Sequence, residues 1–132
     1  MKQIIFILLI APTSMFSQCV FGDCENGGGT YIWEDGTVND GSWKNGELDG
    51  VAVEISYGEN GDFLGIYEGG FIEGVMSGWG TATYYDEDGY QIGTYVGNFL
   101  ENDFNGWGIW IWTDGTFEKG IYIDGELVKE TE

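Results

Sequence analysis

The sequence predicts an all-β fold, an elongated single-layer antiparallel meander built from about four β-hairpin repeats. Three observations support this prediction. Glycines recur at a regular spacing, tight-turn dipeptides separate short apolar or aromatic runs, and the segment after residue 18 lacks the 3.6-residue periodicity of a helix. Because self-similarity at a fixed period indicates a repeat array, we expect each unit to pack against its neighbours.

The glycine spacing divides the chain into four copies. In the first copy, from Gly29 to Gly46, the glycines stand seven, five and five residues apart, and the last copy, from Gly108 to Gly125, repeats these intervals. Two inner copies, from Ala52 to Gly74 and from Gly80 to Asn102, share the spacing nine, eight and five. We therefore expect repeats at about 29–49, 50–77, 78–105 and 106–129, with longer hairpins in the inner two.

Each copy contains two short runs of apolar or aromatic residues that meet at a turn dipeptide. We expect type I′ turns at these dipeptides, because both central residues of that turn need a positive φ. The four sites are Asp35-Gly36, Asn60-Gly61, Asp88-Gly89 and Asp114-Gly115. Asn45-Gly46 and Asp124-Gly125 indicate second turns, at which the chain reverses into the next unit. Two turns in each period predict an up-and-down meander.

Alternation along the strands sorts the aromatic side chains into two sets. One residue per copy follows the third glycine, or its equivalent, by two positions. We predict that these residues stack as a buried structural spine: Trp43, Phe71, Phe99 and Tyr122. A second set shares strand faces in pairs and is our candidate binding face: Tyr31, Trp33, Trp110 and Trp112. Core packing is the alternative interpretation of the second set.

The first 18 residues are typical of a secretory signal peptide. Lys2 supplies a positive charge, residues 4–10 form an apolar run, and residues 14–18 form a short polar cleavage zone. This pattern predicts export to the periplasm or the extracellular space. A lipid-tethered form at Cys19 is an alternative, because that cysteine directly follows the cleavage zone. However, Gln18 stands where a lipoprotein signal usually has a small residue.

Cys19 and Cys24 are the only cysteines, and we predict a disulfide between them because an exported chain meets oxidising conditions. The bond would staple segment 19–27 ahead of the repeat array at 28–129 and contribute about 2 kcal/mol. Residues 130–132 are expected to form a frayed tail. Since the chain has no histidine, two cysteines cannot complete a zinc site, and we predict no metal site and no cofactor.

Charge and composition exclude several classes of function. Four Lys plus Arg against 23 Asp plus Glu give a formal charge of −19, which excludes nucleic acid as a partner and disfavours an anionic membrane. The absence of histidine and arginine excludes the Ser-His-Asp and Cys-His catalytic arrangements. No spacing singles out a pair of carboxylates of the kind glycosidases use. We therefore predict that the chain is not an enzyme.

The order of glycines, aromatic residues and turns resembles the MORN (membrane occupation and recognition nexus) repeat. The pattern G-x-G-T-Y-x-W-x-D-G, followed by G-x-W-K-N-G, stands at Gly27–Gly36 and Gly41–Gly50. It returns at Gly106–Gly125. The chain is similar to secreted bacterial proteins that carry short MORN arrays and a cysteine pair before the first repeat.

The tyrosine of the family's Tyr-x-Gly step is present only in the inner copies. Tyr67 and Tyr95 supply it there, whereas Asn39 and Glu118 occupy the equivalent positions of the outer copies. The outer copies therefore depart from the MORN pattern at the same step.

The resemblance implies an interaction or scaffolding module with a protein partner that the sequence does not identify. Such a partner would bind the aromatic face or extend an edge strand of the sheet. The alternative is a module for cell-envelope glycan, in which the four aromatic residues of the candidate face stack on sugar rings. Asp86, Glu87 and Asp88 supply hard oxygen ligands, so calcium binding near residues 86–88 is left open as an aid to that alternative.

Overall fold

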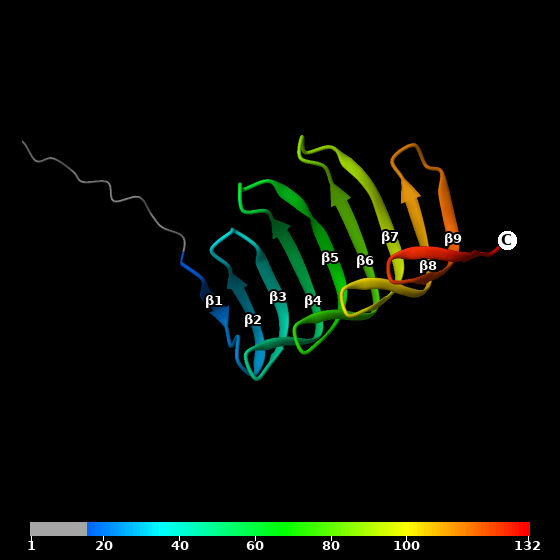
Figure 1. Cartoon of the computed structure of the whole chain (residues 1–132). Helices are drawn as coiled ribbons and strands as arrows, with labels where there is room; N and C mark the ends of the chain where they lie inside the picture. Colours follow the sequence, from blue (N-terminus) through cyan, green and yellow to red (C-terminus); the bar gives the residue numbers. More distant parts are fainter. Residues whose placement is uncertain (1–15) are drawn as a thin grey trace, which may run out of the picture.

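The computed structural model describes residues 16–132 and contains one ten-stranded antiparallel sheet (Figure 1). The strands pair in chain order. They are β1 (Gln18–Gly22), β2 (Gly27–Ile32), β3 (Val38–Lys44), β4 (Glu47–Tyr57), β5 (Phe63–Ile72), β6 (Val75–Tyr85), β7 (Gln91–Leu100), β8 (Asp103–Trp112), β9 (Phe117–Ile123) and β10 (Glu126–Glu130). The described residues contain no helix, and hence none with the length and apolar character of a membrane span. The predicted all-β antiparallel meander is confirmed.

The sheet is bent into an open trough. Figure 1 shows the strands side by side, with the hairpins at their lower ends curled over one face of the sheet. The strand register shifts at the bend, between Gly41 and Trp43, and again between Gly69 and Phe71 in the next hairpin. Bulges of this kind bend a strand and increase its twist. The buried side chains therefore gather inside the curl, on the concave face.

The two sets of hairpin turns have different geometries, and the predicted assignment of type I′ turns to the first set is wrong. At the upper end of the β2–β3 hairpin, Gly36 N donates to Trp33 O at 3.0 Å and Trp33 N donates to Thr37 O at 2.8 Å. Only Gly36 has a positive φ there, as Gly61, Gly89 and Gly115 do in the other upper turns. These upper turns are three-residue loops that end in a glycine bulge.

The type I′ signature appears instead at the lower turns, where both loop residues have positive φ. Asn45 and Gly46 have φ values of 51° and 78°, and Asp124 and Gly125 have values of 50° and 84°. In the β2–β3 hairpin the aspartate side chain stabilises the three-residue loop. Asp35 Oδ1 accepts a hydrogen bond from Thr37 N at 2.8 Å, which closes the longer loop.

A row of small residues crosses the sheet at the bend. In register from β2 to β9 it consists of Gly29, Gly41, Ala52, Gly69, Gly80, Gly97, Gly108 and Gly120. A Cβ at Gly97 would lie 2.5 Å from Gly108 Cα and 2.7 Å from Tyr95 Oη. At Gly69, Gly80, Gly97 and Gly108 glycine is therefore required because a tyrosine ring lies directly on the backbone, in space that any side chain would fill.

The two tyrosines on the glycine row organise the core. Tyr67 and Tyr95 are 3% and 0% exposed, and their hydroxyls donate to Gly70 O at 2.9 Å and Asn98 O at 3.1 Å. Each ring thus buries its apolar surface while its polar tip stays paired.

The four predicted spine residues are all buried, but they do not stack on one another. Tyr67 lies edge-on between Phe71 and Phe99, with ring centroids 5.2 and 4.9 Å away. Tyr95 lies in the same way between Phe99 and Tyr122, at 5.1 Å from each. Trp43, at the other end, pairs with Tyr31 at 5.9 Å. The core is therefore an interleaved aromatic array, because the tyrosine of each Tyr-x-Gly step fills the gap between two spine residues.

Backbone hydrogen bonds connect successive lower hairpins. Gly74 N donates to Leu48 O at 2.8 Å, Asn102 N to Met76 O at 3.1 Å, and Gly125 N to Phe104 O at 3.0 Å. The type I′ geometry of each lower turn aims its second N–H at the hairpin before it. This ladder holds the lower hairpins together along the lip of the trough.

The N-terminal segment is a strand and a cap, and the sheet begins at Gln18 rather than near residue 28. Strand β1 pairs with β2, with Cys19 opposite Tyr31. The predicted disulfide between Cys19 and Cys24 is present, with the two Cα atoms 6.0 Å apart. Cys24 is buried against Gly29, so its sulfur covers the first glycine of the row. Residues 1–15 of the predicted signal peptide lie outside the described part of the chain.

At the C-terminal end, Thr131 N donates to Lys119 O at 2.9 Å. The chain is thus tied to β9 one residue beyond β10, where the sequence led us to expect a frayed tail.

We predict that Gly97→Ala destabilises the fold by about 1 to 3 kcal/mol, because the new methyl group would overlap Tyr95 and the neighbouring backbone. Urea unfolding followed by tryptophan fluorescence measures the change. Gly28→Ala is the matched control, since a Cβ there has open space around it. Equal unfolding midpoints for the two variants would contradict the packing of tyrosine on glycine.

We predict that the double variant Cys19→Ser/Cys24→Ser loses about 2 kcal/mol of unfolding free energy, because the closed loop constrains the unfolded chain. Thermal unfolding with and without dithiothreitol provides the measurement. Reductant should lower the melting temperature of the natural chain and leave that of the double variant unchanged. A natural chain insensitive to reductant would contradict this role.

Candidate functional site

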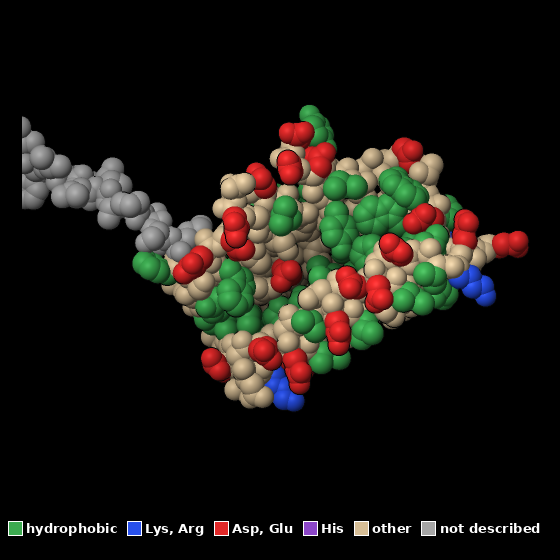
Figure 2. Space-filling view, in the orientation of Figure 1, with side chains coloured by type: hydrophobic (Ala, Val, Ile, Leu, Met, Phe, Trp, Pro, Cys, Tyr) green, Lys and Arg blue, Asp and Glu red, His purple; other side chains and the backbone are tan. Residues whose placement is uncertain are grey.

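The concave face of the sheet is the candidate functional surface. Figure 2 shows hydrophobic side chains gathered inside the trough and Asp and Glu side chains along its rims. The glycine row and the aromatic array form the floor, and the lower hairpins form one wall. A concave surface on a rigid sheet holds its side chains in place before any ligand arrives, which reduces the entropy cost of binding.

The structure divides the predicted binding face into two pairs at opposite ends of the trough. Tyr31 and Trp33 have ring centroids 4.7 Å apart, and Trp110 and Trp112 have centroids 6.3 Å apart. Strands β3 to β7 lie between the two pairs. The outer member of each pair is the accessible one, since Trp33 is 43% and Trp112 39% exposed. Tyr31 and Trp110 instead pack against the core.

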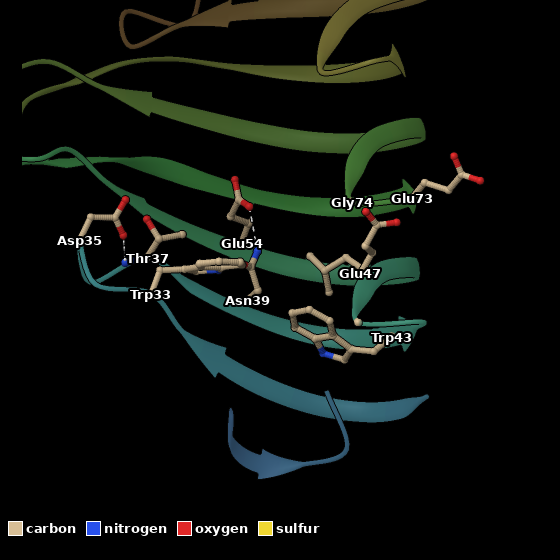
Figure 3. A pocket seen from close by; sticks show the side chains of 11 residues that line it. Trp33, Asp35, Thr37, Asn39, Trp43, Glu47, Glu54, Glu73 and Gly74 are labelled. Carbon is tan, nitrogen blue, oxygen red and sulfur yellow. Dashed lines mark hydrogen bonds between the residues drawn. The ribbon is translucent and has the colours of Figure 1, made fainter. Parts of the chain in front are cut away.

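A hollow of about 440 Å³ lies beside the first pair, and we call it the N-terminal hollow. Figure 3 shows that its lining residues come from the β2–β3 turn, from β3 and β4, and from the lower lip, where the Glu73 side chain points outward. Its lining includes Trp33, Asn39, Trp43, Glu47, Leu48 and Glu54. Its volume lies within the range typical of ligand pockets.

A hydrogen-bonded chain of side chains fixes the floor of the N-terminal hollow. Trp33 Nε1 donates to Asn39 Oδ1, and Asn39 Nδ2 donates to Glu54 Oε2 at 2.7 Å. The other carboxylate oxygen of Glu54 accepts from Ser56 Oγ at 3.1 Å. Asn39 is only 3% exposed, so this network orders the indole and the carboxylate in a partly desolvated place.

The N-terminal hollow exists because Asn39 occupies the tyrosine position. In the strand register Asn39 lies opposite Glu54, and Glu54 lies opposite Tyr67, so the three residues stand in one row on the concave face. Tyr67 fills its part of this row with a ring that contacts Phe71. An asparagine is too short to do so, and the space between Trp33 and Trp43 stays open.

A second hollow of about 370 Å³ lies at the other end of the trough, where Glu118 replaces the tyrosine. We call it the C-terminal hollow. Trp110, Trp112 and Tyr122 are among its lining residues, and Tyr122 Oη donates to Glu118 Oε1 at 3.4 Å. Both departures from the tyrosine pattern therefore coincide with an opening in the aromatic floor.

The hollows of the trough are lined by acidic groups. Acidic residues line each of five hollows found along residues 16–132. Lys44, Lys119 and Lys129 line none of them. The field in the trough is therefore negative, and the chemistry it presents is carboxylate oxygen beside aromatic rings.

In the acidic turn at residues 86–88, the carboxylate of Asp86 is hydrogen-bonded to the backbone of its own hairpin. Asp86 Oδ1 accepts hydrogen bonds from Asp88 N at 3.0 Å and from Tyr90 N at 2.9 Å. Among residues 16–132, no three acidic, histidine or cysteine side chains come together as metal ligands. The arrangement seen is that of an upper hairpin turn closed by aspartate, as at Asp35.

Burial controls the ionisation of the core tyrosines. It raises the pKa of four hydroxyls to about 12, those of Tyr67, Tyr84, Tyr95 and Tyr122. The negative charge of Glu118 adds to the effect at Tyr122. Hydrogen bonds from the Thr116 hydroxyl and backbone act in the opposite direction on Asp114 and lower its pKa.

Sequence reasoning missed Glu54 and the role of Trp43 in the hollow. Asn39 was visible as a departure from the Tyr-x-Gly step, but Glu54 comes 15 residues later and joins it only through the β3–β4 register. On the convex face, Trp79 and Trp107 stack with centroids 6.0 Å apart, which also went unpredicted. Each follows a glycine at a bend, and the sequence does not tell which face such a residue takes.

Comparison with known proteins does not assign the chain to a family. No family model matches the chain, and no curated protein shows significant similarity to it. The structure defines the class of fold, an open antiparallel β-meander with an aromatic trough. The MORN resemblance stays a prediction from the sequence.

We predict that the fold loses stability between about pH 10 and pH 12. An unfolded tyrosine ionises near pH 10, whereas the buried hydroxyls have pKa values of about 12. Their stabilising contribution is complete below pH 10 and is lost as the pH rises through the folded-state pKa. Urea midpoints measured across this range, with tyrosinate absorbance, test the claim. Titration of all tyrosines near pH 10 without a change in midpoint would contradict it.

Proposed function

We propose that this chain is a non-catalytic interaction module of the MORN-like, exported type, and that it binds a protein partner in the trough. The observation that carries the proposal is the trough itself, where exposed tryptophans stand beside ordered carboxylates on a rigid concave sheet. Aromatic anchors surrounded by polar groups are characteristic of protein-binding surfaces.

The chemistry of the chain supports a binding role. The sequence contains no histidine or arginine to act as a general base or to stabilise an anionic intermediate. Several carboxylates already have a structural task, since Asp35, Asp86 and Asp114 each accept hydrogen bonds within their own hairpin turn.

The disulfide supports the exported location. A bond between Cys19 and Cys24 is compatible with an oxidising compartment, and it covers the N-terminal end of the core. The four aspartate and glutamate residues that line the N-terminal hollow also argue against an anionic membrane as the partner.

A module for cell-envelope glycan is the second candidate. Trp33 and Trp112 expose ring surface at the two ends of the trough, and sugar rings stack on such surfaces. Carboxylates beside both rings could accept hydrogen bonds from sugar hydroxyls.

Crosslinking in the native cell, followed by mass spectrometry, tests the proposal. We expect a captured protein, and the double variant Trp33→Ser/Trp112→Ser should reduce its capture about tenfold or more, because truncated aromatic anchors cost at least 2 kcal/mol. Trp79→Ser on the convex face is the matched control, since that ring is 53% exposed. Circular dichroism confirms that each variant folds.

Full capture by the double variant would exclude the trough as the binding surface. A glycan-bearing fraction in place of a protein would favour the second candidate.

A further inference from the structure

The N-terminal hollow combines an ordered carboxylate with the face of an indole ring. Both oxygens of Glu54 are anchored, one by Asn39 and one by Ser56, and each carboxylate oxygen can accept a further hydrogen bond. The indole N–H of Trp33 is used by Asn39, so what the ring offers a ligand is its exposed π-surface. A carboxylate beside an aromatic face is the pairing that binds an organic cation.

The deeper part of the hollow is apolar. Trp43 and Leu48 are 6% and 4% exposed and form its inner wall. A flexible side chain with several methylene groups would lie along this wall while its charged end reached Glu54. Lysine and arginine have this construction, with an apolar stem and a cationic tip.

The rim of the hollow adds further negative charge. Asp35, Glu47 and Glu73 line it, on opposite sides in Figure 3, and no lysine joins them. The indole N–H of Trp33 and one amide N–H of Asn39 already serve internal partners. The hollow therefore offers mainly acceptors and needs a ligand that brings its own donors and a positive charge.

We propose that the N-terminal hollow is a binding site for a lysine or arginine side chain in a basic segment of the protein partner. This inference rests on the proposed function of the trough and deepens it by naming the chemistry of the partner. A neutral glycan would leave the excess acidic charge unpaired, and an anionic glycan would be repelled by it.

The test uses the full chain with its disulfide intact and capped tripeptides as probes. Gly-Lys-Gly and Gly-Arg-Gly are titrated while NMR follows the backbone amides and the tryptophan indole N–H signals. Gly-norleucine-Gly is the neutral counterpart. We expect shifts at Trp33, Asn39 and Glu54 with the cationic peptides only, and weaker binding at higher salt.

A matched pair of variants distinguishes binding at the hollow from attraction by the overall negative charge of the chain. Glu54→Gln should weaken binding of the cationic peptides about tenfold, since it removes a charge-assisted hydrogen bond. Glu68→Gln removes the same charge from the exposed convex face and should change binding less than about twofold. Asn39→Tyr should abolish binding by filling the hollow, and its urea midpoint verifies that it folds.

Each of the following results would overturn the inference. Equal losses in Glu54→Gln and Glu68→Gln would mean that only the overall charge attracts the peptide. Equal binding of the norleucine peptide, or retained binding in Asn39→Tyr, would exclude a cation site in the hollow. Displacement of the lysine peptide by a neutral oligosaccharide would assign the hollow to glycan. If the tripeptides fail while Trp33→Ser/Trp112→Ser still abolishes crosslinking, the inference falls and the proposed function stands.

Discussion

The contact of tyrosine rings with a bare glycine backbone is the constraint on which this structure depends. The ring of Tyr95 lies over Gly97 and Gly108, where a Cβ would meet it at less than van der Waals distance. The same ring then contacts Phe99 and Tyr122, so it joins the backbone at the bend to the aromatic array beyond it. The four central glycines of the row, Gly69, Gly80, Gly97 and Gly108, and the buried core around Tyr67 and Tyr95 both follow from this one contact.

The candidate sites arise where that contact is relaxed. Asn39 and Glu118 cannot cover the glycine row as a tyrosine does, and a hollow opens beside each of them. The end units thus lose packing and gain accessible tryptophan and carboxylate. A fold that repeats one contact in its middle can vary its ends, because the inner tyrosines already hold the sheet together.

Much of the fold could be predicted from the sequence, because glycine spacing and alternation are local signals. They led to the antiparallel meander and to burial of residues such as Phe71. The predicted turn type was wrong at Asp35-Gly36, because an Asp-Gly dipeptide occurs in both two-residue and three-residue loops. Strand β1 was missed because five residues show little periodicity. Glu54 could not be predicted as a site residue, since its contact with Asn39 requires the strand register.

The ladder of lower turns gives the molecule a mechanical direction. Each turn donates a backbone hydrogen bond toward the N-terminal side, as Gly125 does to Phe104 and Gly74 does to Leu48. At the N-terminal end Gly46 donates to Glu25, one residue beyond the covalent bond at Cys24. A force on the C-terminus would therefore peel one hairpin at a time, each leaving its neighbour's contacts intact, whereas the cross-linked end would resist. Unfolding under force would thus run from the C-terminus, hairpin by hairpin, and stop at the disulfide-linked N-terminal end.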